Sequence, residues 1–401
     1  MTEAGIPTVK LDAEHLLNHA QTETGLHDFG DETFREPFQE LVASLEHEAN
    51  LNAVGRFTQY ERLLNTLKNR LRLSEWFRQY PEIQDEEITA PAVIIGLPRT
   101  GTTMLHRVLA SDQRFFAPLW YEVRNPAPFM DWDPKQKDQR LTLAEAEVAA
   151  LLEANPEIAA IHPMDPLGAD EDILLLEHSF YSTVPNAFCN LPSYAKWLFS
   201  HDNQPGYSYL KRQLQFLQWQ KKRSNPGTPA NKWLLKTPHH LHFLDTLLKT
   251  FPDAQIIQTH RDPVHTIPSI SSFNYNLWIT QADNVDPKQV GAQWSDMFAR
   301  GMHHASQVRQ QHSAQFIDIG FRQLLQDPLA MTKSIFEFIN VPVTDESISA
   351  MQRHRAENQR DARPPHDYSL AQFGLTEDQI QTQFSDYRAS YREHISENPQ
   401  H

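Results

Sequence analysis

The sequence predicts an α/β protein built on a doubly wound parallel sheet, with a helical N-terminal region and a helical insertion. Two observations lead to this class. After residue 90, short apolar runs alternate with stretches of helical periodicity, which is the pattern of a parallel sheet covered by helices. Before residue 90, apolar residues recur only at helical spacing. The 401 residues, 40% of them hydrophobic, can bury a large core.

Residues 1–90 form the first predicted unit, a helical region packed on the core. Two helical faces are visible, at Phe38, Leu41 and Leu45 and again at Tyr60, Leu63, Leu64, Leu67 and Leu71. Pro81 and Pro91 then interrupt the pattern, because proline does not fit inside a helix. We therefore expect the boundary of this unit near residue 90.

Residues 91–401 form the second predicted unit, the α/β domain. Its first strand, residues 92–95, is apolar throughout, as expected of a strand buried on both faces. Further strands are expected at residues 233–235, 255–259 and 315–319. The helices among them are expected at residues 102–110, 241–250, 264–273 and 290–311. An insertion at about residues 140–225 is expected to hold helices at 141–154, 171–181 and 207–223. Near the C-terminus, Thr376 and Gln379 predict a capping box.

The charge balance limits the partners of the protein. Acidic residues outnumber basic ones by 51 to 36, which gives a net charge of -15. A strongly acidic surface argues against nucleic acid or an anionic polysaccharide as the principal partner, although a local pocket of Arg, Lys and backbone amides can still bind a small anion. The 20 histidines include His239, His240 and His242, but no HExxH motif is present, so we expect no metal.

Cysteine usage and the N-terminal residues indicate a location. Cys189 is the only cysteine, so no intrachain disulfide can form, and a reducing compartment is favoured. The first residues lack the basic and apolar regions of a signal peptide. No apolar run approaches the roughly 20 residues of a membrane helix. We therefore expect a cytoplasmic protein without a transmembrane segment; its oligomeric state is left open.

The segment from Gly96 to Thr103, GLPRTGTT, is the first candidate for an anion site. It follows a buried strand and opens a helix, so its backbone amides and the helix N-terminus form an anion nest. Gly96 and Gly101 permit the required backbone angles, and Thr102 and Thr103 add hydroxyl donors. The two glycines fit the Walker A pattern GxxxxGK[ST], but Thr102 stands at the position of its lysine. The positive charge lies earlier instead, at Arg99. The loop is P-loop-like without being a nucleoside triphosphatase loop.

A second candidate lies about 160 residues further along. Arg261 follows a predicted strand in the segment THRDP, and Ser269 lies eight residues later in the next predicted helix. A guanidinium at the carboxyl end of a strand, with a hydroxyl two turns into the following helix, suits a phosphate. Taken alone, an Arg-Asp-Pro turn can simply cap a helix. The two motifs together, in this order, are far more specific.

These two segments resemble those of sulfotransferases that use 3′-phosphoadenosine-5′-phosphosulfate (PAPS), in particular a bacterial branch of that family. The loop PRTGTT resembles the 5′-phosphosulfate loop, which implies donor binding by Pro98, Arg99, Thr100, Gly101, Thr102 and Thr103. Arg261 and Ser269 resemble the 3′-phosphate motif. The helical N-terminus, the segment LKTPHHL and the tail HDYSLAQFGL at residues 366–375 extend the resemblance over nearly the whole chain. It implies metal-independent transfer of a sulfuryl group to an acceptor hydroxyl.

The resemblance also implies catalytic residues. Arg99 and Lys236 would stabilise charge on the transferred group and the bridging oxygen; a solvated lysine after a strand is the alternative for Lys236. For the base, Glu122 matches the position of the glutamate of tyrosylprotein sulfotransferases, and an aromatic setting could raise its pKa. His240 is the rival, because cytosolic sulfotransferases use a histidine. Glu122 is favoured, with an N-capping or ion-pairing carboxylate as its structural alternative.

The acceptor site is the least specified part. Glu171 and Asp172 could orient an acceptor, although paired acids at a helix start more often answer the helix dipole. Aromatic residues could line an apolar acceptor pocket or belong to the core: Trp120, Phe180, Phe188, Trp197 and Phe199. We expect a small neutral or apolar alcohol, phenol or lipid. Two other functions stay open: a P-loop kinase or nucleoside triphosphatase with Asp318 as its metal-binding carboxylate, and a non-catalytic protein that binds adenosine 3′,5′-bisphosphate (PAP).

Overall fold

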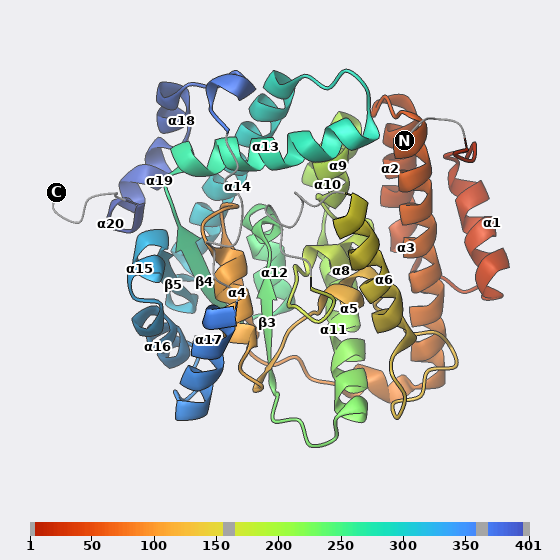
Figure 1. Ribbon diagram of the computed structural model, residues 1–401, viewed down its shortest axis with the longest axis horizontal. Coiled ribbons are helices and arrows are strands. Elements are labelled where there is room, and N and C mark those ends of the chain that lie inside the picture. The colour runs from red at the N-terminus through yellow and green to blue at the C-terminus, as the bar shows by residue number, and fades with distance from the viewer. Residues whose placement is uncertain (1–4, 155–164, 358–367, 396–401) are drawn as a thin grey trace.

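A five-stranded sheet forms the centre of the computed structural model, which describes residues 5–154, 165–357 and 368–395 (Figure 1). The strand order is β2-β3-β1-β4-β5, and every pairing is parallel. The strands are β1 (Ala92–Gly96), β2 (Phe115–Phe116), β3 (Lys232–Lys236), β4 (Gln255–His260) and β5 (Phe316–Gly320). The predicted α/β class and parallel sheet are confirmed. The edge strand β2 was not predicted, because two residues are too few to show a period.

The two faces of the sheet pack against different helices. All five residues of β1 are buried, as the apolar run predicted. Val93 and Ile95 belong to one core cluster, together with side chains from the helices α11 (Gln204–Ser224), α12 (Leu244–Thr250), α13 (Pro263–Gln281) and α14 (Pro287–Gln311). Ala92 and Ile94 belong to a second cluster, with α4 (Thr102–Ala110), α15 (Phe321–Gln326), α16 (Pro328–Phe338) and α17 (Asp345–Glu357). Alternate residues of β1 therefore pack against the helices on opposite faces of the sheet.

The N-terminal helices are part of the first of these clusters. They are α1 (Ala13–Thr24), α2 (Arg35–His47) and α3 (Ala53–Gln79), which stand side by side at the right of Figure 1. Leu63 and Leu67 of α3 are buried in the same cluster as Val93 of the central strand. The boundary near residue 90 stays a prediction, and the core continues across it.

The insertion is helical but more broken than expected. Its helices are α6 (Gln139–Ala154), α8 (Ile173–Glu177), α9 (Val184–Phe188), α10 (Pro192–Ser200) and α11; residues 155–164 lie outside the described part. The single helix predicted at 171–181 is wrong. The chain cannot continue as one helix because Phe180 has a left-handed backbone (φ 64°), and the Ser182 hydroxyl then accepts from the amide of Val184, the first residue of α9. The helix predicted at 241–250 similarly begins as a 3₁₀ turn, Pro238–His242.

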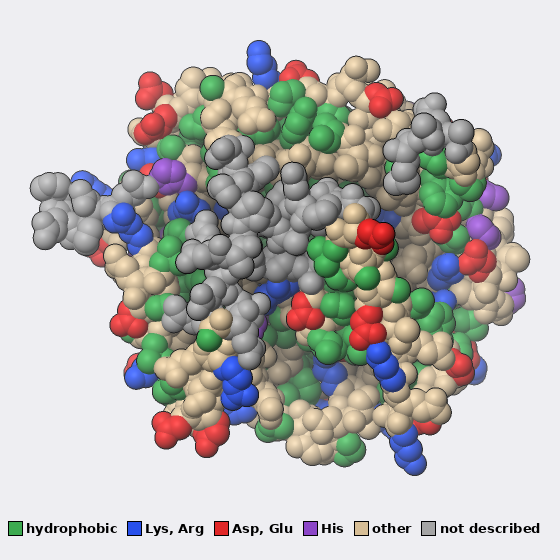
Figure 2. Space-filling model, in the orientation of Figure 1, with side chains coloured by type: hydrophobic (Ala, Val, Ile, Leu, Met, Phe, Trp, Pro, Cys, Tyr) green, Lys and Arg blue, Asp and Glu red, His purple; other side chains and the backbone are tan. Residues whose placement is uncertain are grey.

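The C-terminal segment packs beside the end of β4. It contains α18 (Glu377–Gln383), α19 (Ser385–Ser390) and α20 (Arg392–Ile395), drawn in blue in Figure 1. The capping box of Thr376 and Gln379 is confirmed, whereas His366 and Asp367 of the tail motif lie outside the described residues. Acidic and basic side chains are interspersed over the described part of the face in Figure 2. Among the described residues, no helix is long and apolar enough to cross a membrane.

We predict that Gly55→Ala destabilises the protein at the contact between the N-terminal helices and α13. A Cβ at Gly55 would lie 2.0 Å from the carbonyl oxygen of Gln281, so the two helices would have to separate. The free energy of unfolding should fall by about 1–3 kcal/mol, as for other overpacked sites. Gly227→Ala is the matched control, because nothing lies within 4 Å of a Cβ there. Urea denaturation measures both, and equal stability of the two variants would contradict the proposed tight contact.

Candidate active site

The loop after β1 makes its turn by bringing two backbone segments very close together. Gly96 has φ 145°, and a Cβ there would lie 2.5 Å from Oγ1 of Thr259 in β4. Thr100 Oγ1 donates to the carbonyl of Leu97 (2.7 Å) and lies 2.6 Å from Thr259 Oγ1. The buried Thr100 hydroxyl therefore braces the loop from inside. Gly101, with φ 87°, is the N-cap of α4.

Arg99 joins the two motifs that lie far apart in the sequence. Its backbone is left-handed (φ 67°), an unfavourable conformation for arginine that turns the side chain toward α13. Its Nε donates to Ser269 Oγ (3.2 Å), and a guanidinium nitrogen of Arg261 donates to the Arg99 carbonyl (3.0 Å). The Arg261 guanidinium also lies 4.4 Å from the ring centre of Phe321. Two guanidinium groups, a hydroxyl and a helix N-terminus thus converge on one sheet edge.

Lys236 brings a third strand end to this edge. It is the last residue of β3 and pairs with Ile94 of β1, so its side chain emerges beside the loop. Its ammonium group lies 2.6 Å from Glu171 Oε1 and 3.3 Å from Thr103 Oγ1, at the first turn of α4. Lys236 is fully buried, which contradicts a solvated lysine, and the Glu171 side chain is 26% exposed. Glu171 is therefore the acid that the structure brings next to the lysine.

A buried chain of hydrogen bonds holds the residue after Glu171. Asp172 accepts from the Lys236 amide (2.9 Å) and from His240 Nε2 (2.8 Å), while His240 Nδ1 lies 2.8 Å from the Tyr207 hydroxyl. Burial raises the pKa of the Asp172 carboxyl, but His240 and the Lys236 amide outweigh it and lower the pKa overall. Burial raises the pKa of Tyr207 well above its usual value. These distances fit one assignment of donors and acceptors, in which Tyr207 donates to His240 and His240 donates to Asp172.

Glu122 lies in a structural ion pair. Its carboxylate accepts from Lys221 Nζ at 2.6 and 2.7 Å, from the Leu119 amide at 2.9 Å and from the Tyr121 hydroxyl at 3.3 Å. Only 2% of its side chain is exposed. These contacts match the structural alternative, a helix-capping and ion-pairing carboxylate, and they occupy both oxygens. Whether Glu122 is the base stays a prediction, and the structure shows its carboxylate buried and bound.

Trp120 and Phe180, two of the aromatic residues for which a pocket and a core position were both open, are buried. Trp120 is buried against Ala144 and Val148 of α6. Phe180 is 1% exposed, and its ring centre lies 4.8 Å from that of Phe38 in α2. Both side chains are therefore committed to packing between helices. Spacing along the sequence could not separate the two cases, because core aromatics and pocket aromatics follow the same helical period.

Sequence reasoning missed two contacts at this site. Tyr207 closes the buried chain from α11, 33 residues before His240, and carries no local motif. The pairing of Lys236 with Glu171 joins residues 65 positions apart. Its only sequence signal was the pair of acids at 171 and 172. A contact between distant segments of this kind follows from topology rather than from local pattern.

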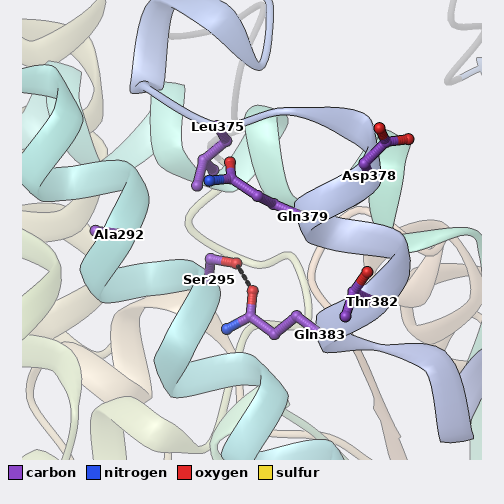
Figure 3. Close-up of a pocket in the computed structure, with 7 residues that line it drawn as sticks. All are labelled: Ala292, Ser295, Leu375, Asp378, Gln379, Thr382 and Gln383. Atoms are coloured by element: carbon purple, nitrogen blue, oxygen red, sulfur yellow. Dashed lines mark hydrogen bonds between the residues drawn. The ribbon is translucent and has the colours of Figure 1, made fainter.

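A groove between α14 and α18 lies outside this cluster. It has a volume of about 570 Å³, and Ser295 donates to Gln383 across it at 2.6 Å (Figure 3). Its seven lining residues include one carboxylate, Asp378, and no basic side chain. This chemistry does not suit a phosphate-bearing ligand, in contrast to the cluster around Arg99.

Two solved structures share the fold of this chain. The structure resembles that of sulfotransferase STF1 from Mycobacterium tuberculosis H37Rv, with a TM-score of 0.81, 29% identity and coverage of 95% of this chain and 99% of that one. It also resembles sulfotransferase STF9 from Mycobacterium avium, with a TM-score of 0.86, 25% identity and coverage of 96% and 98%.

A curated relative and a family model complete the comparison. The relative is omega-hydroxy-beta-dihydromenaquinone-9 sulfotransferase Stf3 of Mycobacterium bovis, 25% identical over 264 residues, a match that spans 63% of each chain. The model described as the sulfotransferase family matches residues 91–345, a stretch that includes the Arg99 loop, Lys236, Arg261 and Ser269. Since that match covers more than half of the sequence, the chain belongs to the sulfotransferase family.

Proposed function

We propose that this protein is a PAPS-dependent sulfotransferase that acts on a hydroxyl group of a small acceptor. The observation that carries the proposal is the meeting of Arg99, Ser269 and Arg261 at the edge where β1 and β4 end. PAPS carries anionic groups at two ends, and this edge offers a cationic, hydroxyl-bearing site for each. The amides of residues 97–103 with Arg99 would hold the 5′-phosphosulfate, and Arg261 with Ser269 would hold the 3′-phosphate.

Lys236 and Glu171 supply the groups that the reaction needs. When bound, PAPS supplies the sulfuryl group, whose bond to the 5′-phosphate oxygen breaks as a bond to the acceptor oxygen forms. The Lys236 ammonium is suited to stabilise negative charge on the departing oxygen. The Glu171 carboxylate is suited to take the acceptor proton, because it is partly exposed and the contact with Lys236 places it beside the proposed reaction centre. Asp172, whose carboxylate is held by His240, fixes the backbone beside Glu171.

The contacts favour Glu171 as base over the two residues expected from the resemblance. Glu122 already binds Lys221 with both oxygens. His240 is fully buried, and both of its ring nitrogens have hydrogen-bond partners. A base needs contact with the acceptor hydroxyl, and of these three side chains only that of Glu171 is appreciably exposed. His240 then acts as a support for Asp172.

A P-loop kinase or nucleoside triphosphatase is the less supported alternative. Thr102 replaces the lysine that such enzymes direct at the β- and γ-phosphates. Asp318, the candidate metal-binding carboxylate, instead pairs with Arg309 at 2.6 Å and with His260 Nε2 at 2.8 Å. A non-catalytic PAP-binding protein would keep the phosphate sites without a need for the pairing of Lys236 and Glu171.

For the acceptor, we propose a neutral, apolar alcohol of lipid character. The name of the relative Stf3 describes a hydroxylated dihydromenaquinone as its substrate. In this chain, Met104 follows Thr103 in α4 and is 37% exposed, and Leu167 precedes Glu171 by four residues and is 56% exposed. Exposed apolar side chains thus lie close in the sequence to Thr103 and to Glu171. A cytoplasmic location also remains a proposal, which rests on the single cysteine.

We predict that PAP binds in the presence of EDTA and that Arg261→Ala weakens it. Loss of a charge-assisted contact to the 3′-phosphate should cost about 2 kcal/mol of binding free energy. Isothermal titration calorimetry measures both. The matched control is Arg78→Ala, because Arg78 lies on the surface of α3 and pairs there with Glu75. Binding only with magnesium, or tighter binding of ATP than of PAP, would refute the donor assignment.

We also predict that Glu171→Gln lowers turnover by about 10²- to 10⁴-fold, the usual contribution of a general base. Lys236→Met should lower turnover as well, because charge on the departing oxygen develops in the transition state. Transfer from labelled PAPS to the best acceptor measures both. Glu122→Gln serves as the comparison and should lose stability rather than turnover. If Glu171→Gln stays near wild type while Glu122→Gln or His240→Gln is inactive, the base is one of those residues.

The acceptor proposal has its own test. Labelled PAPS is offered with simple alcohols, phenols, hydroxylated isoprenoid quinones and heparan-like chains. We expect transfer to the neutral apolar compounds, because a polyanion would meet a protein with a net charge of -15. Efficient sulfation of heparan-like chains with little transfer to lipids would overturn the proposal.

A further inference from the structure

Asp262 carries a carboxylate at the start of α13, the helix that also holds Ser269 of the proposed 3′-phosphate site. Asp262 follows Arg261 in the sequence, and its Oδ1 caps α13 by accepting from the Val264 amide (3.1 Å). Only 17% of its side chain is exposed, so water screens its charge incompletely. A phosphate bound by Arg261 would therefore be repelled by the neighbouring residue. Asp262 is needed at this position, because its side chain accepts a hydrogen bond from the backbone at the N-terminus of α13, the helix that carries Ser269.

Arg388 of α19 neutralises this carboxylate. A guanidinium nitrogen of Arg388 lies 2.8 Å from Asp262 Oδ1, and 28% of the Arg388 side chain is exposed. The preceding residue, Tyr387, donates to the carbonyl of Arg261 over a long 3.5 Å. Two adjacent residues of the C-terminal segment thus contact the two adjacent residues of the phosphate motif.

A buried network fixes the C-terminal helices in this position. The ring of His260, the last residue of β4, stacks on Tyr391 with 4.1 Å between centres. His260 Nε2 lies 2.8 Å from Asp318 of β5, which also binds Arg309 of α14. Arg309 in turn donates to the Tyr391 hydroxyl at 3.2 Å. The helices that carry Arg388 are therefore anchored to two strands and a long helix, and Arg388 has little freedom to leave Asp262.

We propose that Arg388 is a positioning residue for recognition of the donor's 3′-phosphate, acting by compensating the charge of Asp262. The inference rests on the proposed function, since it concerns the same nucleotide. Without Arg388, the negative charge of Asp262 repels the 3′-phosphate. The binding free energy lost in this way affects only nucleotides that carry a 3′-phosphate. The C-terminal segment thereby contributes to the choice between nucleotides with and without that group.

The test compares PAP with AMP, which lacks only the 3′-phosphate. Arg388→Met should weaken PAP by about tenfold, the scale of an uncompensated close charge, and leave AMP nearly unchanged. Asp262→Asn keeps a capping oxygen and removes the charge, so it should tighten PAP relative to AMP. The double variant should recover the wild-type ratio of the two affinities. Arg392→Met, an exposed arginine in α20, is the matched control.

The outcomes separate this inference from the donor assignment. If the wild-type protein does not prefer PAP over AMP, the proposed function fails. If it does, but Arg388→Met weakens both nucleotides equally or neither, charge compensation is wrong and the contact is only structural. Failure of Asp262→Asn to restore PAP binding in the Arg388→Met background would equally contradict charge compensation. Should Arg388→Met not fold, Asp262→Asn alone decides, since unchanged PAP affinity in that variant contradicts the inference.

Discussion

The site depends on the parallel pairing of β1 with β3 on one side and with β4 on the other. Parallel strands end at the same edge, so three segments of the chain that lie far apart in sequence leave the sheet side by side. The contact of Gly96 with Thr259 makes this pairing tight, because it leaves no room for a side chain between the loop and β4. Any displacement of β4 would separate Arg99 from Ser269 and Arg261.

Buried polar groups then hold this edge in one arrangement. Asp172 links the end of β3 to the insertion, through the Lys236 amide, and to α11, through His240 and Tyr207. An unpaired carboxylate at this depth would cost several kcal/mol, so the residues of this chain depend on one another. The cations of the site are similarly held before any ligand arrives: Arg99 by Ser269, and Lys236 by Glu171. The free-energy cost of reorganising such a site when a ligand binds is therefore small.

The parts that could be predicted from the sequence are those with a local pattern. The strands at β1, β3, β4 and β5, the helix α4 and the capping box at Thr376 follow from periodicity and from caps, and the structure confirms them. The two phosphate motifs at Arg99 and Arg261 could be recognised from their residues, and the structure adds that the strands before them are adjacent. The pairing of Lys236 with Glu171 could not be recognised in this way, because it depends on where a broken helical insertion returns to the sheet. Glu122 and Glu171 are distinguished by their burial and by their partners, Lys221 and Lys236, which no local pattern reveals.

The core shared by the N-terminal helices has a consequence for how the protein can be divided. The family match begins at residue 91 and ends at residue 345. A fragment trimmed to those limits would lose α3, whose Leu63 and Leu67 are buried in the same cluster as Val93, and would expose that face of the core to water. It would also lose α19, which contacts the end of β4. The segment matched by the family model is thus smaller than the unit that folds, and soluble expression of the shorter piece alone is not to be expected.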